Sequence, residues 1–453
     1  MNRYEKYRDT GLTWVRKIPL GWTLYKVNTV FDERREKVSD QEYEALSVTK
    51  NGIFKQLDNV AKTKDGDNRK KVQINDFVIN SRSDRKGSSG LSGFEGSVSL
   101  INIVLKIKKS HSKFIHYLLK SVPFQEEFYR NGKGIVADLW STNFQSMKSI
   151  LLPIPPMDEQ EQIANYLDWK INEIDRLIQI EKKKIKELKR LAFNVIAEFV
   201  LRGIDTQNYK KSNIEWIDDI PSHWNEVSIR GYVNIIRGNS SFTKDDLKNQ
   251  GKYVGLQYGK VYKTEIIDSD FHFYVSEKFY KNSQVVNRND IIIVSTSETV
   301  EDLGHTSFYD RDDIGLIGGE QILLKPLNNI NSKYLFYLSK VFRAQLQLCA
   351  TGIKVYRFKI SDLKQVYIPL PPIKEQKKIV SNIEYKLNQI DKRMKNNYDL
   401  IKELELLKQS LISEVVTGKI DVRNIVIPEY EKVVVLENET DELDEMEEIE
   451  DGN

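Results

Sequence analysis

The sequence contains two copies of one unusual segment, separated by almost half the chain. The segment LPIPPMDEQEQIANYLDWKINEIDRL at 152–177 returns as IPLPPIKEQKKIVSNIEYKLNQIDKR at 368–393, so that Pro153 and Pro369 are 216 positions apart (369 − 153). A second landmark, TWVRKIPLGW at 13–22, returns as EWIDDIPSHW at 215–224. An internal duplication of this size predicts two similar halves. It also indicates that the bound partner has two parts.

A long helix is expected after each proline-rich motif. Proline sets a rigid entry to a helix but cannot lie in its interior without losing a hydrogen bond. Beyond the prolines, apolar residues recur at alternating spacings of four and three, which is the pattern of a coiled-coil seam. A polar residue occupies the same place in each seam, Glu181 in the first helix and Asn397 in the second, and we expect this pair to fix the register. The expected seam residues are Leu167, Ile171, Ile174, Ile178, Ile185, Leu188, Ala192, Val195 and Phe199, followed in the second helix by Ile383, Leu387, Ile390, Met394, Ile401, Leu404, Lys408, Leu411 and Val415.

The predicted fold class is α+β. Two similar mixed α/β domains are expected to be separated by two long helices, which pair as an antiparallel coiled coil with pseudo-two-fold symmetry. The alternative is that each helix packs only on its own domain. The expected segments are a first domain at 1–150, an entry motif and helix at 151–206, a second domain at 207–366, a second entry motif and helix at 367–421, and an acidic, flexible tail at 422–453.

The charge of the chain is unevenly distributed. The net charge is +3, but residues 437–453 contain ten acidic residues and no Lys or Arg, which leaves +13 (69 − 56) on residues 1–436. A basic body of this kind suits a polyanion, although a solvated surface is the alternative. The single cysteine, Cys349, and five scattered histidines predict neither a disulfide nor a metal site. With no apolar run long enough for a membrane helix and no signal peptide, we expect a cytoplasmic protein.

Catalytic motifs are missing from the sequence. No Gly-Lys is followed by Ser or Thr, as a phosphate-binding loop requires, and the dinucleotide fingerprint GxGxxG is absent. The only Pro-Pro pairs lie in the two entry motifs, so the polar-Pro-Pro-aromatic site of amino-methyltransferases is absent as well. The sequence therefore predicts a recognition protein without catalytic residues.

The paired LPIPPMDEQEQI and IPLPPIKEQKKI motifs, each opening a long helix after a variable domain, resemble the specificity subunit of type I restriction–modification systems. The resemblance covers residues 10–421, and the acidic tail departs from it. It implies that residues 20–150 and 222–366 are target recognition domains, each of which reads one half of an asymmetric split site in double-stranded DNA. It also implies two methyltransferase partners that methylate adenine with S-adenosylmethionine, and two motor–nuclease partners that use ATP and Mg. The chain itself is then expected to bind no cofactor.

Polar and basic loop residues are candidates for DNA contact. Lys and Arg on phosphates supply affinity, whereas side-chain donors and acceptors in the major groove supply sequence specificity. An ordinary solvated loop is the alternative for any single one of them. The candidates in the first domain are Lys62, Lys64, Arg69, Lys70, Lys71, Arg82, Arg85, Lys86, Ser88 and Ser89, and those in the second are Arg237, Asn239, Ser240, Lys244, Tyr258, Lys260, Lys354, Tyr356 and Arg357.

The repeated Glu-Gln pairs are candidates for partner docking. Glu159, Gln160, Glu375 and Gln376 would present two near-equivalent surfaces to two copies of one partner. The alternative is that they only stabilise the helix N-termini electrostatically. For the whole chain, the competing hypothesis is a coiled-coil scaffold that joins two protein-binding domains without contacting DNA.

Overall fold

The structure is a computed structural model that describes residues 2–56, 66–134, 140–204 and 207–433. It divides into two compact units. Unit 1 consists of Met1–Lys182 and Tyr398–Asn453, and unit 2 consists of Lys183–Asn397. Each unit therefore contains one globular domain and one part of each long helix, α5 (Met157–Arg202) and α9 (Ile373–Val416). Within the described residues, no helix is long and apolar enough to cross a membrane.

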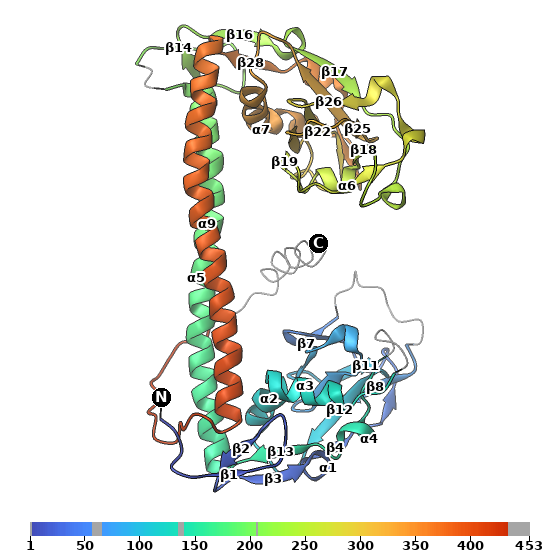
Figure 1. The fold of residues 1–453 in the computed structure, drawn as a ribbon, viewed down its shortest axis with the longest axis vertical. Helices are drawn as coiled ribbons and strands as arrows, with labels where there is room; N and C mark the ends of the chain where they lie inside the picture. The colour runs from blue at the N-terminus through green and yellow to red at the C-terminus, as the bar shows by residue number, and fades with distance from the viewer. Residues whose placement is uncertain (1, 57–65, 135–139, 205–206, 434–453) are drawn as a thin grey trace. The chain divides into compact units, whose positions relative to one another are not determined.

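The globular domain of unit 1 is a mixed α/β structure (Figure 1). Its helices are α1 (Val27–Val30), α2 (Ser112–Lys120), α3 (Val122–Arg130) and α4 (Phe144–Met147), with a short 3₁₀ turn η1 (Ser83–Arg85). Its strands are β1 (Tyr7–Asp9), β2 (Lys17–Pro19), β3 (Thr23–Lys26), β4 (Phe31–Glu33), β5 (Lys37–Val38), β6 (Leu46–Thr49), β7 (Gly52–Lys55), β8 (Arg69–Val72), β9 (Phe77–Asn80), β10 (Ser89–Leu91), β11 (Gly96–Ser99), β12 (Asn102–Ile107) and β13 (Leu151–Ile154).

The globular domain of unit 2 is also a mixed α/β structure. Its helices are α6 (Tyr258–Val261), α7 (Ser332–Leu348) and α8 (Ile360–Lys364), with 3₁₀ turns η3 (Ile229–Gly231), η4 (Lys244–Asp246), η5 (Glu277–Phe279) and η6 (Asn282–Gln284). Its strands are β14 (Tyr209–Lys211), β15 (Asp219–Pro221), β16 (Asn225–Ser228), β17 (Val233–Arg237), β18 (Tyr253–Leu256), β19 (Ile266–Ile267), β20 (Tyr274–Val275), β21 (Val285–Val286), β22 (Ile291–Val294), β23 (Thr296–Ser297), β24 (Thr306–Tyr309), β25 (Gly315–Ile317), β26 (Gln321–Pro326), β27 (Tyr356–Arg357) and β28 (Tyr367–Leu370).

The strand order confirms that the two domains are copies of one fold. The main sheet runs β10-β9-β12-β4 in unit 1, and β24-β22-β26-β17 in unit 2 with β19 added at the edge. The central pairing keeps its register, because Ile79 lies opposite Ile103 in unit 1 and Ile293 lies opposite Ile322 in unit 2. Strands β9 and β22 are apolar runs buried on both faces, which explains why neither shows polar alternation.

The turn before each central strand is specified by the same two residues. Asn75 and Asn289 adopt φ values of 68° and 74°, a left-handed conformation that Asn tolerates better than most residues. The aspartate that follows, Asp76 or Asp290, accepts a hydrogen bond of 2.9 Å from the backbone N–H three positions earlier. The two turns therefore begin β9 and β22 in the same way.

The two long helices pair with each other, as the seam spacing predicts, and they are antiparallel, as expected. Unit 1 combines the start of α5 with the end of α9, and unit 2 combines the end of α5 with the start of α9. In unit 1 the ammonium of Lys408 donates to Asp175 at 2.6 Å across the pair. Seam residues that are buried include Leu167, Ile171, Ile174, Ile178, Leu404, Leu411 and Val415 in unit 1, and Ile185, Ile383 and Ile390 in unit 2.

The expected seam is wrong at the end of α5. Val195 and Phe199 are only half-buried, whereas the neighbouring Ile196 and Val200 are buried. Ile196 and Val200 belong to the core of the second domain, together with Trp224. The helix face that packs changes here because α5 stops contacting only its partner helix and enters the globular core.

A buried carboxylate fastens the start of α5 to its own domain. Glu159 accepts hydrogen bonds from the hydroxyl of Tyr4 at 2.6 Å and from Trp22 Nε1 at 2.9 Å. The next residue, Gln160, accepts from the backbone N–H of His111 at 2.9 Å and donates to the carbonyl of Pro155 at 2.9 Å. We call this Glu-Gln pair with its partners the latch of unit 1.

Unit 2 contains the equivalent latch. Glu375 accepts from Trp224 Nε1 at 3.0 Å and lies 2.8 Å from His223 Nε2. Gln376 accepts from the N–H of Asn331 at 2.7 Å and donates to the carbonyl of Pro371 at 2.8 Å. The repeated Glu-Gln pairs therefore do more than complete a helix terminus, because they join each long helix to the domain that precedes it.

A second repeated contact lies farther along each helix. Asp168 of α5 binds Lys113 and accepts from the hydroxyl of Tyr117 at 2.7 Å, and both of these residues are on α2, which lies beside α5 (Figure 1). In unit 2 the corresponding ion pair joins Lys333 of α7 to Glu384 of α9.

Replacing Glu159 with alanine tests the latch. The change leaves the Tyr4 hydroxyl and the Trp22 indole N–H without their acceptor, so we expect the first domain to lose about 2–3 kcal/mol of local stability. Denaturant-dependent hydrogen exchange of peptides covering residues 4–26 measures this loss. Glu161→Ala, an exposed carboxylate on the same helical turn, is the control. Equal protection in the two variants would show that the latch does not stabilise the domain.

Candidate nucleic-acid interface

The loop between β9 and β10 is the most accessible group of candidates in unit 1. Arg82, Arg85 and Lys86 are exposed. Arg82 forms an ion pair with Asp84 at 3.1 Å, and Lys86 forms one with Glu126 of α3. Ser88 and Ser89 are buried at the end of the loop. The three basic side chains can therefore reach a phosphate backbone, whereas the two serines shape the loop.

The basic candidates on β8 are used within the fold. Arg69 is buried and donates to the hydroxyl and the carbonyl of Ser97, and burial lowers the pKa of its guanidinium. Lys70 donates to the carbonyl of Asn102 at 2.7 Å, and burial lowers its pKa as well. Lys71 lies over the ring of Tyr43 and binds Glu36 at 3.2 Å. We therefore leave these three residues out of the interface. Lys62 and Lys64 lie outside the described residues.

In unit 2 the fold brings together two candidate segments that are about 100 positions apart in the sequence. Strand β27, with Tyr356 and Arg357, pairs with β23, where Arg357 lies opposite Thr296. Ser297 of the same strand lies close enough to Tyr258 of α6 to influence the pKa of its phenol, which burial raises. Strand β23 therefore holds both segments at one place.

The segment that leads into β27 projects from the fold. Residues 351–355 are exposed, with Ile353 at their centre 91% exposed and Lys354 next to it. Thr351 and Arg357 exchange backbone hydrogen bonds of 2.9 and 3.0 Å, which closes the segment into a hairpin-like loop. Gly352 has a φ of 128°, a conformation that favours glycine. This loop is an accessible part of the interface in unit 2, whereas Tyr258 and Lys260 of α6 are only half-buried.

The remaining candidates of unit 2 follow β17. Arg237, Asn239 and Lys244 are exposed, whereas Ser240 is buried. Gly238 between them has no room for a side chain, because an added Cβ would lie 2.0 Å from the carbonyl oxygen of Gly318.

Three neighbours of these candidates were missed by the sequence reasoning. The missed residues are Tyr262, Phe273 and Lys281. The ring of Tyr262 stacks on that of Tyr258 at 5.6 Å, and the ring of Phe273 lies 4.5 Å from the ammonium of the candidate Lys260. The ammonium of Lys281 donates to the carbonyl of Asn239 at 3.1 Å. Aromatic rings interleaved with lysines were the available signal, because this pattern suits nucleic-acid surfaces.

The sequence reasoning also missed a third internal repeat. SKFIHYLLK at 112–120 returns as SKYLFYLSK at 332–340, 220 positions later (332 − 112). The two segments form α2 and the first half of α7. The repeat contains the ion pairs to the long helices described above and ends in Lys120 and Lys340.

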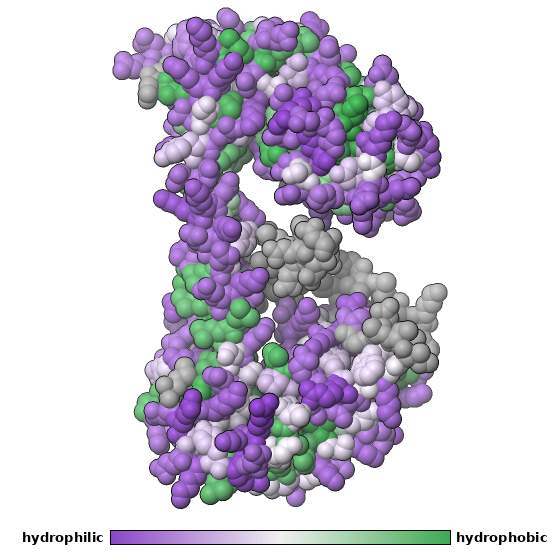
Figure 2. Space-filling model, viewed as in Figure 1, coloured by the Kyte–Doolittle hydropathy of each residue, from purple (hydrophilic) through white to green (hydrophobic). Residues whose placement is uncertain are grey.

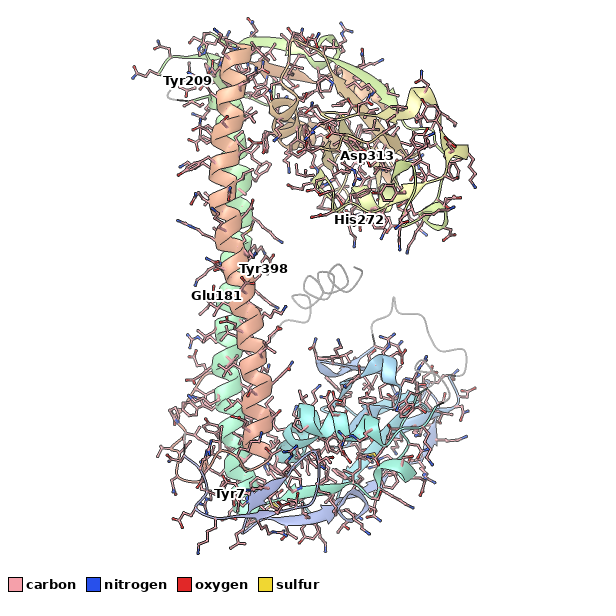
Figure 3. The ribbon with its side chains drawn as sticks, in the orientation of Figure 1. Tyr7, Glu181, Tyr209, His272, Asp313 and Tyr398 are labelled. Atoms are coloured by element: carbon pink, nitrogen blue, oxygen red, sulfur yellow. The ribbon has the colours of Figure 1, made fainter. Side chains whose placement is uncertain are left out.

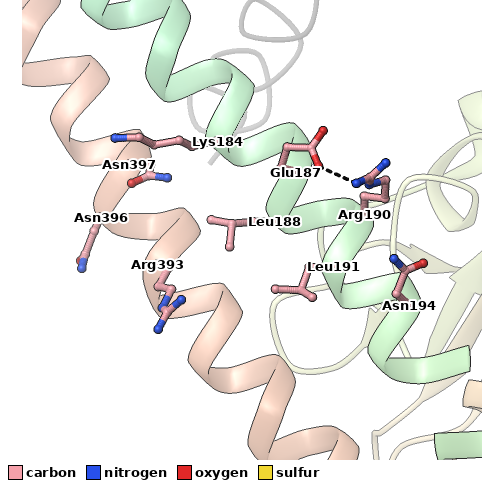
Figure 4. Close-up of a pocket in the computed structure, with 9 residues that line it drawn as sticks. All are labelled: Lys184, Glu187, Leu188, Arg190, Leu191, Asn194, Arg393, Asn396 and Asn397. Atoms are coloured by element: carbon pink, nitrogen blue, oxygen red, sulfur yellow. Dashed lines mark ion pairs between the residues drawn. The ribbon is translucent and has the colours of Figure 1, made fainter. Parts of the chain in front are cut away.

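The two predicted register residues occupy different environments. Glu181 of α5, labelled in Figure 3, is buried, and Asn397 of α9 is half-buried. Asn397 lines a groove of about 570 Å³ in unit 2 (Figure 4). The other lining residues are Lys184, Glu187, Leu188, Arg190, Leu191, Asn194, Arg393 and Asn396. The register role of the pair stays a prediction.

The docking prediction for the Glu-Gln pairs also stays untested. Glu159, Gln160 and Gln376 are buried, and the latches occupy their polar atoms. A partner could reach them only by displacing the latch. Among the described residues no group of three or more His, Cys, Asp or Glu side chains is placed to hold a metal ion.

The comparisons with known proteins agree with this arrangement of paired domains and helices. Residues 19–190 and 221–406 match the type I restriction modification DNA specificity domain. The putative type I restriction enzyme MjaX specificity subunit of Methanocaldococcus jannaschii is 24% identical over 422 residues, covering 90% of this chain and 89% of that subunit. The EcoBI specificity subunit of Escherichia coli is 24% identical over 308 residues, covering 61% of this chain and 60% of that subunit.

A solved structure shares the fold. A chain from a study of assembly and conformational transition in the type I R-M system matches with a TM-score of 0.61 at 16% identity, covering 89% of this chain and 99% of that chain. The two matched segments lie in both halves of the duplication and span most of its length. The chain therefore belongs to the family of type I restriction–modification DNA specificity subunits, which recognise DNA and are not themselves catalytic.

Proposed function

We propose that this chain reads one asymmetric, bipartite DNA sequence, with each unit reading one half. The observation that carries the proposal is the pair of domains with the same strand order but different exposed loops. Unit 1 presents Arg82, Arg85 and Lys86, whereas unit 2 presents Lys354 and Arg357 in the segment 351–357. One fold with two different loop chemistries suits two different half-sites.

The two long helices serve as spacer and as a docking platform in this proposal. Two methyltransferase subunits bind them, methylate adenine and supply S-adenosylmethionine. Two motor–nuclease subunits join through the methyltransferases and supply ATP and Mg. We expect the complex to act on DNA in the cytoplasm.

Exposed apolar side chains on the coil in unit 1 support the docking role. Figure 2 shows hydrophobic residues gathered on the visible face of the coil in this unit. The exposed ones are Leu177, Ile180, Leu400, Leu406 and Leu407. Grouped exposed apolar residues mark interaction surfaces, because their burial against a partner is favourable. The residues 216 positions away from Leu177, Ile180, Leu400 and Leu406 in unit 2 are polar or basic: Arg393, Asn396, Lys184 and Arg190.

Methylation of random-sequence DNA tests the main proposal. The full chain, assembled with its methyltransferase subunits, is expected to methylate one split sequence, which is found by sequencing the modified sites. Arg357→Ala is expected to relax one half only, because the residue lies on a unit 2 loop. Methylation without sequence preference would contradict the proposal. A scaffold that does not touch DNA would also lack the steep loss of DNA affinity with added salt that phosphate contacts produce.

Leu407→Lys tests the docking surface. Placing an ammonium among the exposed leucines should weaken binding of the purified methyltransferase subunit by roughly tenfold or more. Titration calorimetry gives the affinity. Gln409→Lys adds the same charge at another exposed position of α9 and should bind normally. If both variants bind like the unaltered chain, the partner docks elsewhere.

Helix length tests the spacer role. Inserting one heptad after Lys182 in α5 and one after Asn397 in α9 preserves the seam pattern and adds about 10.5 Å to each helix. At 3.4 Å per base pair, the gap between the two half-sites should grow by about three base pairs. The same sequencing of methylated sites reads the new gap. An unchanged gap with unchanged half-sites would show that the helices do not set the spacing.

A further inference from the structure

Lys120 is the last residue of α2, and its ammonium is held by backbone oxygens. It donates to the carbonyls of Lys50 at 2.5 Å, Gly87 at 3.1 Å and Ser89 at 3.4 Å. No ion pair joins it to a carboxylate within the described part of the chain. Burial lowers the pKa of this ammonium to about 8. A cation that is partly desolvated without a carboxylate partner is costly, so its three acceptors must be well placed.

The three acceptors belong to two separate segments. Gly87 lies in the loop between β9 and β10, which presents the exposed basic residues of unit 1, and Ser89 begins β10 directly after this loop. Lys50 lies at the tip of the β6–β7 hairpin. The two segments also touch directly, because a Cβ added to Gly90 would lie 3.1 Å from the Cα of Gly52. One ammonium therefore ties a DNA-facing loop to a neighbouring hairpin.

The rest of the helical corner secures the same loop. Gln125 Nε2 donates to the carbonyl of Lys120 at 2.7 Å. The hydroxyl of Tyr129 donates to the backbone carbonyl of Arg85 at 3.4 Å, and Glu126 forms an ion pair with Lys86. The contacts of Tyr129 and Glu126 reach only the loop, and the contact of Gln125 reaches only the end of α2. Lys120 alone among these residues reaches the hairpin as well.

We propose that Lys120 is a positioning residue for sequence reading, which sets the relative placement of the β9–β10 loop and the β6–β7 hairpin so that unit 1 reads its half-site. This inference rests on the proposed bipartite function. Lys120 contacts no base itself. Lys120 influences recognition indirectly, because a side chain can read a base edge only when its loop is held in one position. Each mismatched base pair then lowers the affinity for DNA by a large factor.

The internal duplication supplies a control for this role. Lys340 is the counterpart of Lys120 in unit 2, but its ammonium binds the exposed Glu265 at 2.6 Å and lies over the ring of Phe336. Replacing Lys340 therefore removes an ammonium at the equivalent helix position, but it breaks no hydrogen bonds to backbone carbonyls like those that Lys120 makes.

The test compares Lys120→Met, Lys120→Arg and Lys340→Met in the full chain assembled with its methyltransferase subunits. The probe is random-sequence double-stranded DNA, and sequencing of methylated sites gives the preference at each half. We expect Lys120→Met to lower the preference at one half-site by roughly tenfold or more while the other half stays unchanged. The half affected must be the one that Arg357→Ala spares. Lys120→Arg should restore the preference, because guanidinium N–H groups can also donate to carbonyls. Lys340→Met should leave both halves intact.

Several outcomes would overturn the inference. Lys120→Met with both half-sites intact, or with both equally relaxed, removes the positioning role while leaving the bipartite function standing. If Lys120→Met does not fold, Lys120→Gln, which keeps two donors on a shorter chain, is measured in the same way. Failure of Lys120→Gln to fold would make Lys120 a folding residue. A wild-type assembly without sequence preference would instead contradict the proposed function itself.

Discussion

Each long helix is joined to its domain by a carboxylate, Glu159 buried and Glu375 half-buried, and by the buried glutamine that follows it. Glu159 binds a tryptophan that precedes it by 137 positions, and Glu375 binds one that precedes it by 151. Because a carboxylate withdrawn from water is costly unless it is hydrogen-bonded, these partners fix where the helix leaves the domain. The remaining architecture depends on this joint, since the seam of the coil and the loops of the domain lie on either side of it.

The joint separates the parts of the scaffold that are similar in both units from the exposed loops that differ between them. The latches, the turns at Asn75 and Asn289 and the central strands have the same chemistry in both units. The exposed loops differ, and the residues that hold them differ too: Lys120 ties two segments together in unit 1, whereas Lys340 binds Glu265. One scaffold that carries two different sets of exposed loops needs this separation, because loop changes must not disturb the helix entry.

Much of the fold could be predicted because its signals are local or repeated. The prolines, the seam spacing and the duplication together predicted two similar domains and a coiled coil, and the structure and the comparisons confirm them. The candidate site was harder to predict. Arg69, Lys70 and Lys71 carry the charge expected of DNA contacts, yet their headgroups are already bound to Ser97, Asn102 and Glu36 of the same domain. Composition gives the number of cations but not their surroundings.

The sequence by itself determined the internal duplication, the two helices and the family, because repeats and heptads are patterns in the order of the residues along the chain. Tertiary structure alone decided which side chains are free to meet DNA. It buried Ser88, Ser89 and Ser240, joined the loop at 351–357 to Ser297 through strand pairing, and brought Lys120 to carbonyls 70 and 33 positions away. The physical reason is that burial and hydrogen bonding depend on segments distant in the chain, which no local pattern records.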